Sequence, residues 1–130
     1  MRLLVTLCLP ILSHSAMALT FDCLGSDEVN FRGHFSIEKY EHRQEYLGSA
    51  HSFAILKEPS VKDCRVPWYE KFEIRAEERT DHYLHKHEYA ENCILVLKLP
   101  RKGNTVEIWV EDPNGSRLST PIRRECANDA

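Results

Sequence analysis

The chain is 130 residues long and carries 17 Lys and Arg against 20 Asp and Glu, so its formal net charge at pH 7 is −3. This length suits one domain and allows a modest hydrophobic core. Because proteins that hold phosphate backbones are usually basic, the charge balance argues against strong, nonspecific binding of nucleic acid and leaves only a local basic patch for that purpose.

The N-terminal segment has the pattern of a secretory signal peptide. Arg2 precedes an apolar run over residues 3–12, and a small-residue segment ends in Ala16-Met17-Ala18. The run is too short for a membrane anchor, which needs about 20 apolar residues. We therefore expect a signal peptide over residues 1–18 and a single secreted domain over residues 19–130, with no membrane association.

The first elements of this domain are predicted to be a short edge strand over residues 29–32 and then a helix. Ser36 suits the N-cap of the helix, and Phe35 and Tyr40 can form a hydrophobic staple around it. Gly48 suits the C-terminal end, where helices favour glycine. Only part of one helix face is apolar, so we expect the helix to lie on a sheet rather than to be buried.

The rest of the chain is dominated by strand patterns. Residues 67–75 alternate with a period of two, and residues 93–99 are almost continuously apolar, which is typical of a central strand. The charged residues 76–91 between them are predicted to form a long hairpin loop. Further strands are expected at residues 52–56, 106–111 and 118–122. These patterns predict an α+β fold in which one helix is followed by an antiparallel meander of four to five strands.

The cysteines indicate disulfide bonds. Of the five cysteines, Cys8 leaves with the candidate signal peptide. An even number in a small secreted chain indicates stapling, and the other four allow three pairings. We pair Cys23 with Cys126 because they lie at the two ends of the domain, which leaves Cys64 for Cys93. No Cys-x-x-Cys motif favours metal binding or redox chemistry instead.

Alternation along residues 67–75 also separates a core face from a polar face. The side chains expected to face the core are Trp68, Phe72 and Ile74. Those expected on the polar face are Tyr69, Lys71, Glu73 and Arg75. Arg79 continues the polar side, and Trp109 lies on the polar face of a later strand. The polar face therefore combines cations with aromatic rings.

Such a face suits a binding surface. Aromatic rings beside Lys and Arg can stack bases and meet phosphates, and the same residue types are frequent hot spots for protein partners. We select Tyr69, Lys71, Arg75 and Trp109 as candidate binding residues. A solvated face without a ligand is the competing interpretation. Between the two kinds of partner, the acidic chain favours protein over RNA.

The order of several motifs resembles a known family. The motifs are Phe21-Asp22-Cys23 just after the signal site, the aromatic segment 68–74, the apolar segment 93–99 and the closing Cys126. In this order the chain resembles the ribonuclease-like effectors associated with haustoria, which powdery mildews and related fungal pathogens secrete. The resemblance implies the microbial guanyl-specific ribonuclease fold, with one helix on the convex side of a curved antiparallel sheet and the chemistry on the concave side.

The catalytic residues that the resemblance implies have no match in this chain. Active members use a Glu base on the aromatic strand, an Arg on the next strand and a His acid on the strand after that. Here alternation turns Glu70 toward the helix, Lys71 takes the place of the base, residues 92–94 lack the arginine, and no histidine follows His87. A protonated lysine cannot accept a proton. We therefore expect a pseudoenzyme without catalytic residues or a cofactor.

A histidine cluster is the remaining candidate for chemistry. His82, His85 and His87 lie close to Asp81 and Glu88, and imidazole with carboxylate can bind a first-row metal. The spacing matches no closed zinc site and the segment has the composition of a solvated loop, so we expect no metal. A pH-responsive loop stays open as an alternative, because histidine changes charge between pH 5 and 8.

Together these observations predict a secreted fungal effector that is not an enzyme and suppresses plant defence by binding a host protein, RNA or ribonucleoprotein. We expect a monomer that acts in host tissue or inside the host cell and whose surface a host immune receptor recognises. One alternative is an active secreted ribonuclease that uses Glu70 or Glu73 with His51 or the clustered histidines. Another is an extracellular inhibitor or antimicrobial protein. A glycosylation sequon at Asn114 is compatible with secretion.

Overall fold

The computed structural model describes residues 18–25, 30–39, 45–56 and 63–128, and these residues form strands and no helix. The strands share one antiparallel sheet. Their bounds are β1 Leu19–Cys23, β2 Phe31–Lys39, β3 Glu45–Ile55, β4 Tyr69–Glu78, β5 His82–Ala90, β6 Cys93–Pro100, β7 Thr105–Glu111, β8 Ile122–Glu125 and β9 Ala127–Asn128. The prediction of an α+β fold is therefore wrong, because the described chain is all-β.

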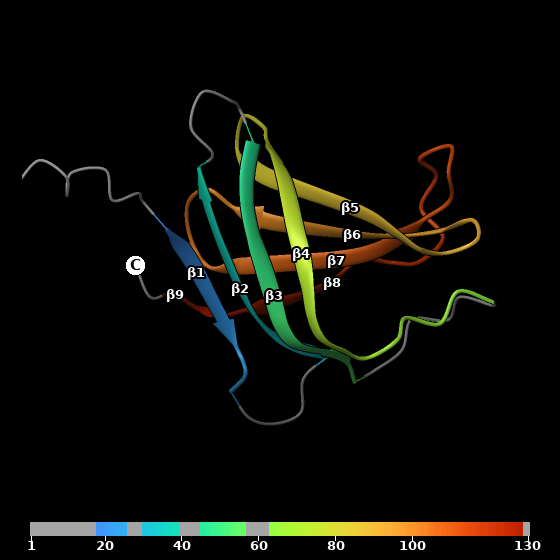
Figure 1. The fold of residues 1–130 in the computed structure, drawn as a ribbon, viewed down its shortest axis with the longest axis horizontal. Helices are drawn as coiled ribbons and strands as arrows, with labels where there is room; N and C mark the ends of the chain where they lie inside the picture. Colours follow the sequence, from blue (N-terminus) through green and yellow to red (C-terminus); the bar gives the residue numbers. More distant parts are fainter. Residues whose placement is uncertain (1–17, 26–29, 40–44, 57–62, 129–130) are drawn as a thin grey trace, which may run out of the picture.

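The sheet is a meander that nearly closes on itself. Each strand from β1 to β8 pairs with its sequence neighbours in the antiparallel direction. Only Cys126 separates β8, which pairs with β7, from β9, which pairs with β1. The last segment therefore joins the two ends of the sheet and gives it a barrel-like form (Figure 1). Closure of this kind covers strand edges that would otherwise attract other chains.

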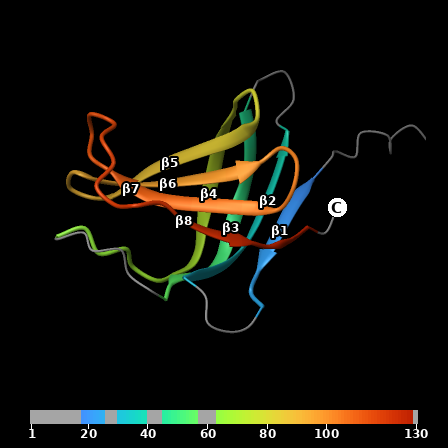
Figure 2. The ribbon, with the colours of Figure 1, turned by 180° about the vertical axis from the view of Figure 1, so that it is seen from behind.

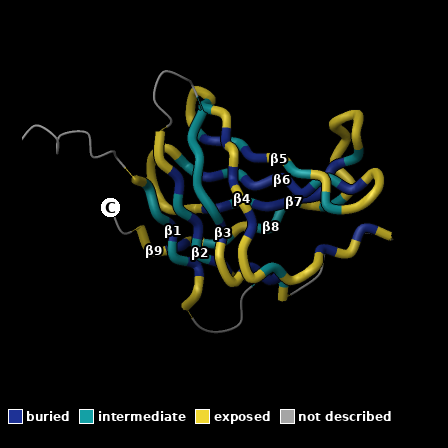
Figure 3. The backbone as a smooth tube through the Cα atoms, viewed as in Figure 1, coloured by how far each residue is buried: buried dark blue, intermediate teal, exposed yellow. Residues whose placement is uncertain are grey.

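The sheet folds into two halves with the core between them. Figure 1 shows β1 to β4 crossing β5 to β8 at a steep angle, and Figure 2 shows the second half from the other side. Buried positions recur along the strands of both halves (Figure 3). The core side chains include Phe21, Phe31, Phe35, Phe53 and Phe72 from the first half and Leu95, Leu97, Leu99 and Ile108 from the second. Each such side chain contributes about 1.5–3 kcal/mol on burial.

The two predicted disulfide bonds are confirmed. Cys23 pairs with Cys126 and Cys64 pairs with Cys93, with sequence separations of 103 and 29 residues. The first bond fastens β1 to the residue between β8 and β9, where the sheet closes. Closing a loop of this length stabilises the fold by roughly 4–5 kcal/mol in the chain-entropy model. The second bond holds the segment before β4 against the start of β6.

The predicted helix from Ser36 to Gly48 is replaced by the end of β2 and the start of β3. Burial along β2 alternates, with Phe35 and Ile37 inside and Ser36 half-buried between them, which is a period of two rather than 3.6. Tyr40, the other half of the expected staple, lies outside the described residues. Ser36 and Gly48 are typical of helix ends, but pairing between β2 and β3 makes this segment a pair of strands.

Gly48 has a different purpose from the one that the sequence suggested. A helix C-terminal glycine takes a positive φ, but Gly48 is not among the residues with positive φ. Gly48 lies opposite Ile37 in the β2–β3 ladder. A Cβ at this position would clash with the carbonyl oxygen of Ser36 and lie 2.7 Å from the Cα of Ile37. The glycine therefore permits close approach of two strands.

Four further segments differ from prediction. The charged residues 76–91, expected as a loop, form the end of β4 and all of β5. The expected strand at 118–122 is mostly loop, because β8 begins at Ile122. The strand expected at 52–56 is the second part of the longer β3, and residue 29 of the expected edge strand lies outside the described ranges. Alternation explains β5, since its charged side chains point outward.

The signal-peptide prediction falls almost entirely on residues 1–17, which lie outside the described ranges. Within the ranges that the structure describes, no helix is long and apolar enough to cross a membrane.

Candidate functional site

The candidate site lies where β4 and β5 diverge. The two strands pair only at Glu77–Leu84 and Glu78–Tyr83, next to their shared turn. From this point β4 continues along β3 and β5 continues along β6. Figure 1 shows the two strands separating from their common turn as one half of the sheet crosses the other. The divergence leaves part of β4 and part of β5 without a ladder between them.

A histidine ring ends the β4–β5 ladder. The Nδ1 atom of His85 lies 3.0 Å from the amide nitrogen of Arg75 and 3.1 Å from its carbonyl oxygen. The ring thus occupies the place that main chain of β5 would take if the ladder continued. His85 is only 5% exposed. Arg75 is therefore anchored from the core side while its own side chain points to solvent.

A basic cleft lies on the outer surface of this region. It has a volume of about 290 Å³ and is lined by Arg75, Glu77, Arg79, Leu84 and Lys86. Alternation explains the set, because these residues occupy outward positions of β4 and β5 or the turn between them. Three cations face one carboxylate here, so the cleft is locally positive although the chain is acidic.

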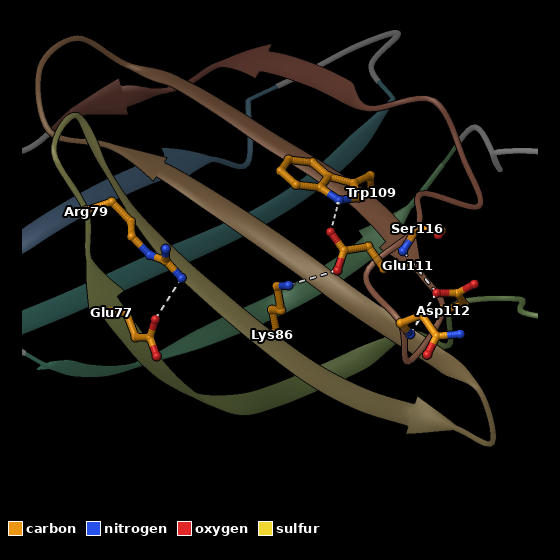
Figure 4. Close-up of polar contacts among 8 residues, drawn as sticks. Glu77, Arg79, Lys86, Trp109, Glu111, Asp112 and Ser116 are labelled. Carbon is orange, nitrogen blue, oxygen red and sulfur yellow. Dashed lines mark hydrogen bonds and ion pairs between the residues drawn. The ribbon is translucent and has the colours of Figure 1, made fainter.

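The cations of the cleft differ in their partners. Arg79 forms an ion pair with Glu77 at 2.8 Å, and both side chains are well exposed. Lys86 forms an ion pair with Glu111 of β7 at 2.9 Å (Figure 4). Arg75 forms no ion pair with any residue in the described part of the chain. Its guanidinium is thus the cation that is free to meet an external anion.

Trp109 lies beside the cleft on the outer face of β7 and is covered rather than open to solvent. It is only 6% exposed, and its Nε1 donates a hydrogen bond to Glu111 at 2.9 Å. Glu111 therefore holds the indole with one oxygen and Lys86 with the other (Figure 4). The guanidinium of Arg117 lies 4.3 Å from the centre of the indole ring and covers it. The expectation that Trp109 is an exposed aromatic residue is wrong.

The loop after β7 explains this cover. Asp112 accepts hydrogen bonds from the amides of Asn114 and Ser116 through Oδ1, at 2.9 and 3.0 Å. The resulting turn brings Arg117 into a bridge with Glu111. Sequence alternation places Trp109 on the outer face of β7 correctly, but it cannot show that a folded loop covers this face. Asn114 of the sequon is exposed in the turn.

The other predicted binding residues divide between the two faces of the sheet. Lys71 and Arg75 are exposed, as expected. Tyr69 instead turns inward, where the centre of its ring lies 5.2 Å from the centre of the Phe72 ring. Burial raises the pKa of the Tyr69 hydroxyl. Trp68, expected in the core, is 60% exposed. Simple alternation therefore fails at the start of β4.

An irregularity at the β3–β4 pairing causes this failure. Inward-facing residues on β4 step by three, from Tyr69 to Phe72, instead of by two. Their partners across the ladder are Phe53 and Ala50, which are also three apart. Ser52 lies between these partners with a φ of 53°, a conformation that shifts the alternation of a strand.

The three clustered histidines do not converge. His85 and His87 face the core, and burial lowers the pKa of His87 and lowers that of His85 to about 4. His82 is part of an ion pair with Asp81 at 2.6 Å. The described residues contain no group of three His, Cys, Asp or Glu side chains that could hold a metal ion.

The acid and base of the ribonuclease alternative are not brought into contact. His51 bonds to Ser49 through Nε2 at 3.0 Å, and neither Glu70 nor Glu73 forms a hydrogen bond or ion pair with it. In the ladder His51 lies opposite Lys71, and Glu73 lies opposite Ser49. A general base and acid must both reach one substrate position, and no hydrogen bond or ion pair joins His51 to either glutamate among the described residues.

Sequence reasoning missed Lys86 because it placed residues 76–91 in a loop. A signal was present: ring-bearing residues recur at every second position of β5, namely Tyr83, His85, His87 and Tyr89. Histidine is usually counted as a polar residue, which hides this alternation. Once these rings are placed inside, Leu84 and Lys86 must point outward into the cleft.

A second cleft lies beside Trp68. It has a volume of about 360 Å³ and its lining residues are Ala54, Ile55, Arg65, Val66, Pro67 and Trp68. Five of its six lining residues are apolar, and Arg65 is the exception. Comparisons with family models, with curated proteins and with solved structures found no match to this chain. The function is therefore inferred from the geometry of the β4–β5 region.

Proposed function

We propose that this protein is a secreted binding protein rather than an enzyme, and that it holds an anionic group of a partner protein in the cleft between β4 and β5. The observation that supports the proposal is Arg75, an exposed guanidinium without an ion pair among the described residues, beside Arg79 and Lys86. A guanidinium presents several donors in one plane and binds a carboxylate through two parallel hydrogen bonds.

The surroundings of the cleft favour a carboxylate on a protein over an RNA backbone. A single anion meets three cations here, but a longer phosphate chain would soon meet the exposed Glu70, Glu73 and Glu88 on the same strands. Repeated phosphate contacts usually need a continuous basic surface. The net charge of −3 opposes such contacts as well.

This proposal keeps two parts of the effector hypothesis, secretion and the binding of a host protein. The two disulfide bonds support the proposal of secretion, because disulfides form and persist in oxidising compartments. The ribonuclease-like fold is not retained, because the described residues form an all-β sheet.

The test is a binding titration of the oxidised protein with two probes, a fluorescent oligoglutamate peptide and a structured ribosomal RNA, each at two salt concentrations. We expect the peptide to bind, more weakly at high salt, and the RNA to remain unbound and intact. Tighter binding of RNA than of the peptide would contradict the proposal.

Arg75→Gln should weaken peptide binding by about 10- to 100-fold, because a charge-assisted hydrogen bond contributes about 1.5–3 kcal/mol. Arg123→Gln is the matched control, since Arg123 is an exposed arginine of β8 that pairs with Glu107 at 2.7 Å and lies outside the cleft. Equal losses in the two variants would show that only net charge matters.

A further inference from the structure

The divergence of β4 and β5 leaves two strand edges that face each other without a ladder. On β4, pairing with β5 stops at Glu77, although the strand begins at Tyr69. The amide of Arg79 bonds to His82, and the amide and carbonyl of Arg75 meet the His85 ring. Because alternate residues point to the same side of a strand, the main chain of Glu73 also points toward β5.

Rings from the inner faces of the two strands lie next to one another where the ladder is missing, and we call them the ring cluster: Tyr69, Phe72, His85, His87 and Tyr89. Neighbouring ring centres lie 5.2 Å apart for Tyr69 and Phe72, 5.1 Å for Phe72 and His87, and 5.6 Å for His85 and His87. Tyr69, His87 and Tyr89 are half-buried. Solvent therefore reaches part of the ring cluster.

The ring cluster also contains an unpaired polar atom. The Nε2 atom of His85 is buried and has no hydrogen-bond partner within the described ranges. A buried polar atom without a partner costs free energy, so a group that formed a hydrogen bond with it would stabilise the protein. One side of the cluster is bounded by the segment before β4, because Tyr89 donates a hydrogen bond to the carbonyl oxygen of Cys64.

The cleft on the outer surface supplies positive charge. Arg75 and Lys86 line it from the two diverging strands, so an acidic side chain in the cleft meets both cations. An extended segment has side chains on alternate faces, so its neighbours on either side of that acid would point down onto the ring cluster. The ring cluster, the open main-chain edge of β4 and the two cations Arg75 and Lys86 therefore all fit one kind of occupant, an extended segment that carries an acidic side chain.

We propose that the partner segment binds as an added β-strand along the open edge of β4 at Glu73, with an acidic side chain between Arg75 and Lys86 and apolar neighbours on the ring cluster. This inference rests on the proposed function, and it identifies the partner as an extended acidic and apolar peptide segment. A strand edge offers alternating donors and acceptors, which a peptide main chain matches and a nucleic acid does not.

The test compares three labelled peptides of equal composition with the oxidised protein. The first alternates Val and Glu, the second groups its Glu residues together, and the third repeats the first with N-methyl groups along one edge. N-methylation removes the donors that an added strand needs and leaves the side chains unchanged. We expect the first peptide to bind at least tenfold more tightly than each of the others.

Variants of the protein give an independent test. Glu73→Pro removes the edge donor, and Glu73→Gln is the control that keeps it while removing the same charge. We expect binding of the alternating peptide to fall at least tenfold in the proline variant relative to the glutamine variant. Far-ultraviolet circular dichroism checks that both variants fold.

The outcomes separate this inference from the proposed function. Equal affinity for the N-methylated and unmodified peptides would overturn strand addition. If Arg75→Gln weakened the binding of all three peptides, the proposed function would stand without strand addition. If Arg75→Gln weakened the binding of none of them, the proposed function and strand addition would both fail. Sedimentation of the free protein is the last check, because a dimer lost in Glu73→Pro would show that a second copy, rather than a partner segment, occupies the edge.

Discussion

The imidazole Nδ1 of His85 lies within 3.1 Å of both the amide nitrogen and the carbonyl oxygen of Arg75. One ring nitrogen can serve only one of these groups, either as an acceptor for the amide proton or as a donor to the carbonyl. In each case a buried ring anchors the main chain of a surface arginine. The protonation of His85 is therefore linked to the structure of the cleft.

This linkage predicts that the protein loses stability as the pH falls below about 6.5. Burial lowers the pKa of His85 from 6.5 to about 4 in the folded state. Between these values the unfolded chain binds the proton at His85 and the folded chain does not, so the contribution of His85 to the free energy of unfolding rises with pH across this window and is constant outside it. The loss should be on the order of 3 kcal/mol for this shift.

Urea unfolding at several pH values between 4 and 7 measures the effect. His85→Leu should flatten the dependence within this window, although His87, whose pKa is also lowered by burial, keeps part of it. His82→Gln is the control, because alternation along β5 places His82 on the face opposite to that of His85. A slope that is the same in His85→Leu as in the original protein would contradict the assignment.

A second prediction concerns the close approach of β2 and β3. Gly48→Ala should destabilise the protein by about 3 kcal/mol or more, because the added methyl group meets main chain that cannot move without breaking the ladder. Gly25→Ala is the matched control, since a Cβ there has only an ordinary contact with the side chain of Arg124. Thermal unfolding of both variants measures the difference. A helix ending at Gly48 would not give a steric loss of this kind.

The two tryptophans should report opposite environments. Trp68 is exposed, whereas Trp109 is buried beneath Arg117. Trp68→Phe should therefore leave blue-shifted fluorescence that iodide quenches poorly, and Trp109→Phe should leave red-shifted fluorescence that iodide quenches readily. Steady-state quenching of the two folded variants is sufficient. The reverse result would restore Trp109 as an open aromatic platform.

Local chemistry allowed part of this structure to be predicted. Both cysteine pairs are confirmed, because the ends of a small closed sheet must meet. The apolar residues 93–99 and the alternating residues 106–111 form β6 and β7 as predicted. The exposure of Lys71 and Arg75 is also confirmed, since they lie on the regular part of β4.

The errors have physical causes that act over long sequence distances. Ser36 and Gly48 resemble helix caps, but pairing between β2 and β3 determines their conformation. The inward turn of Tyr69 depends on the irregular backbone at Ser52 of the neighbouring strand. The cleft itself arises because β4 and β5 diverge, and no local pattern indicates where a ladder between two strands ends.

The most direct test of the central claim is to map where an acidic peptide binds, by nuclear magnetic resonance of the isotope-labelled protein titrated with the alternating Val and Glu peptide. The account predicts the largest shift changes at the Arg75 side-chain Nε–H and at the amides of Glu73, Leu84 and Lys86, with little change around Trp68. Changes concentrated in the cleft beside Trp68, with Arg75 unaffected, would contradict it.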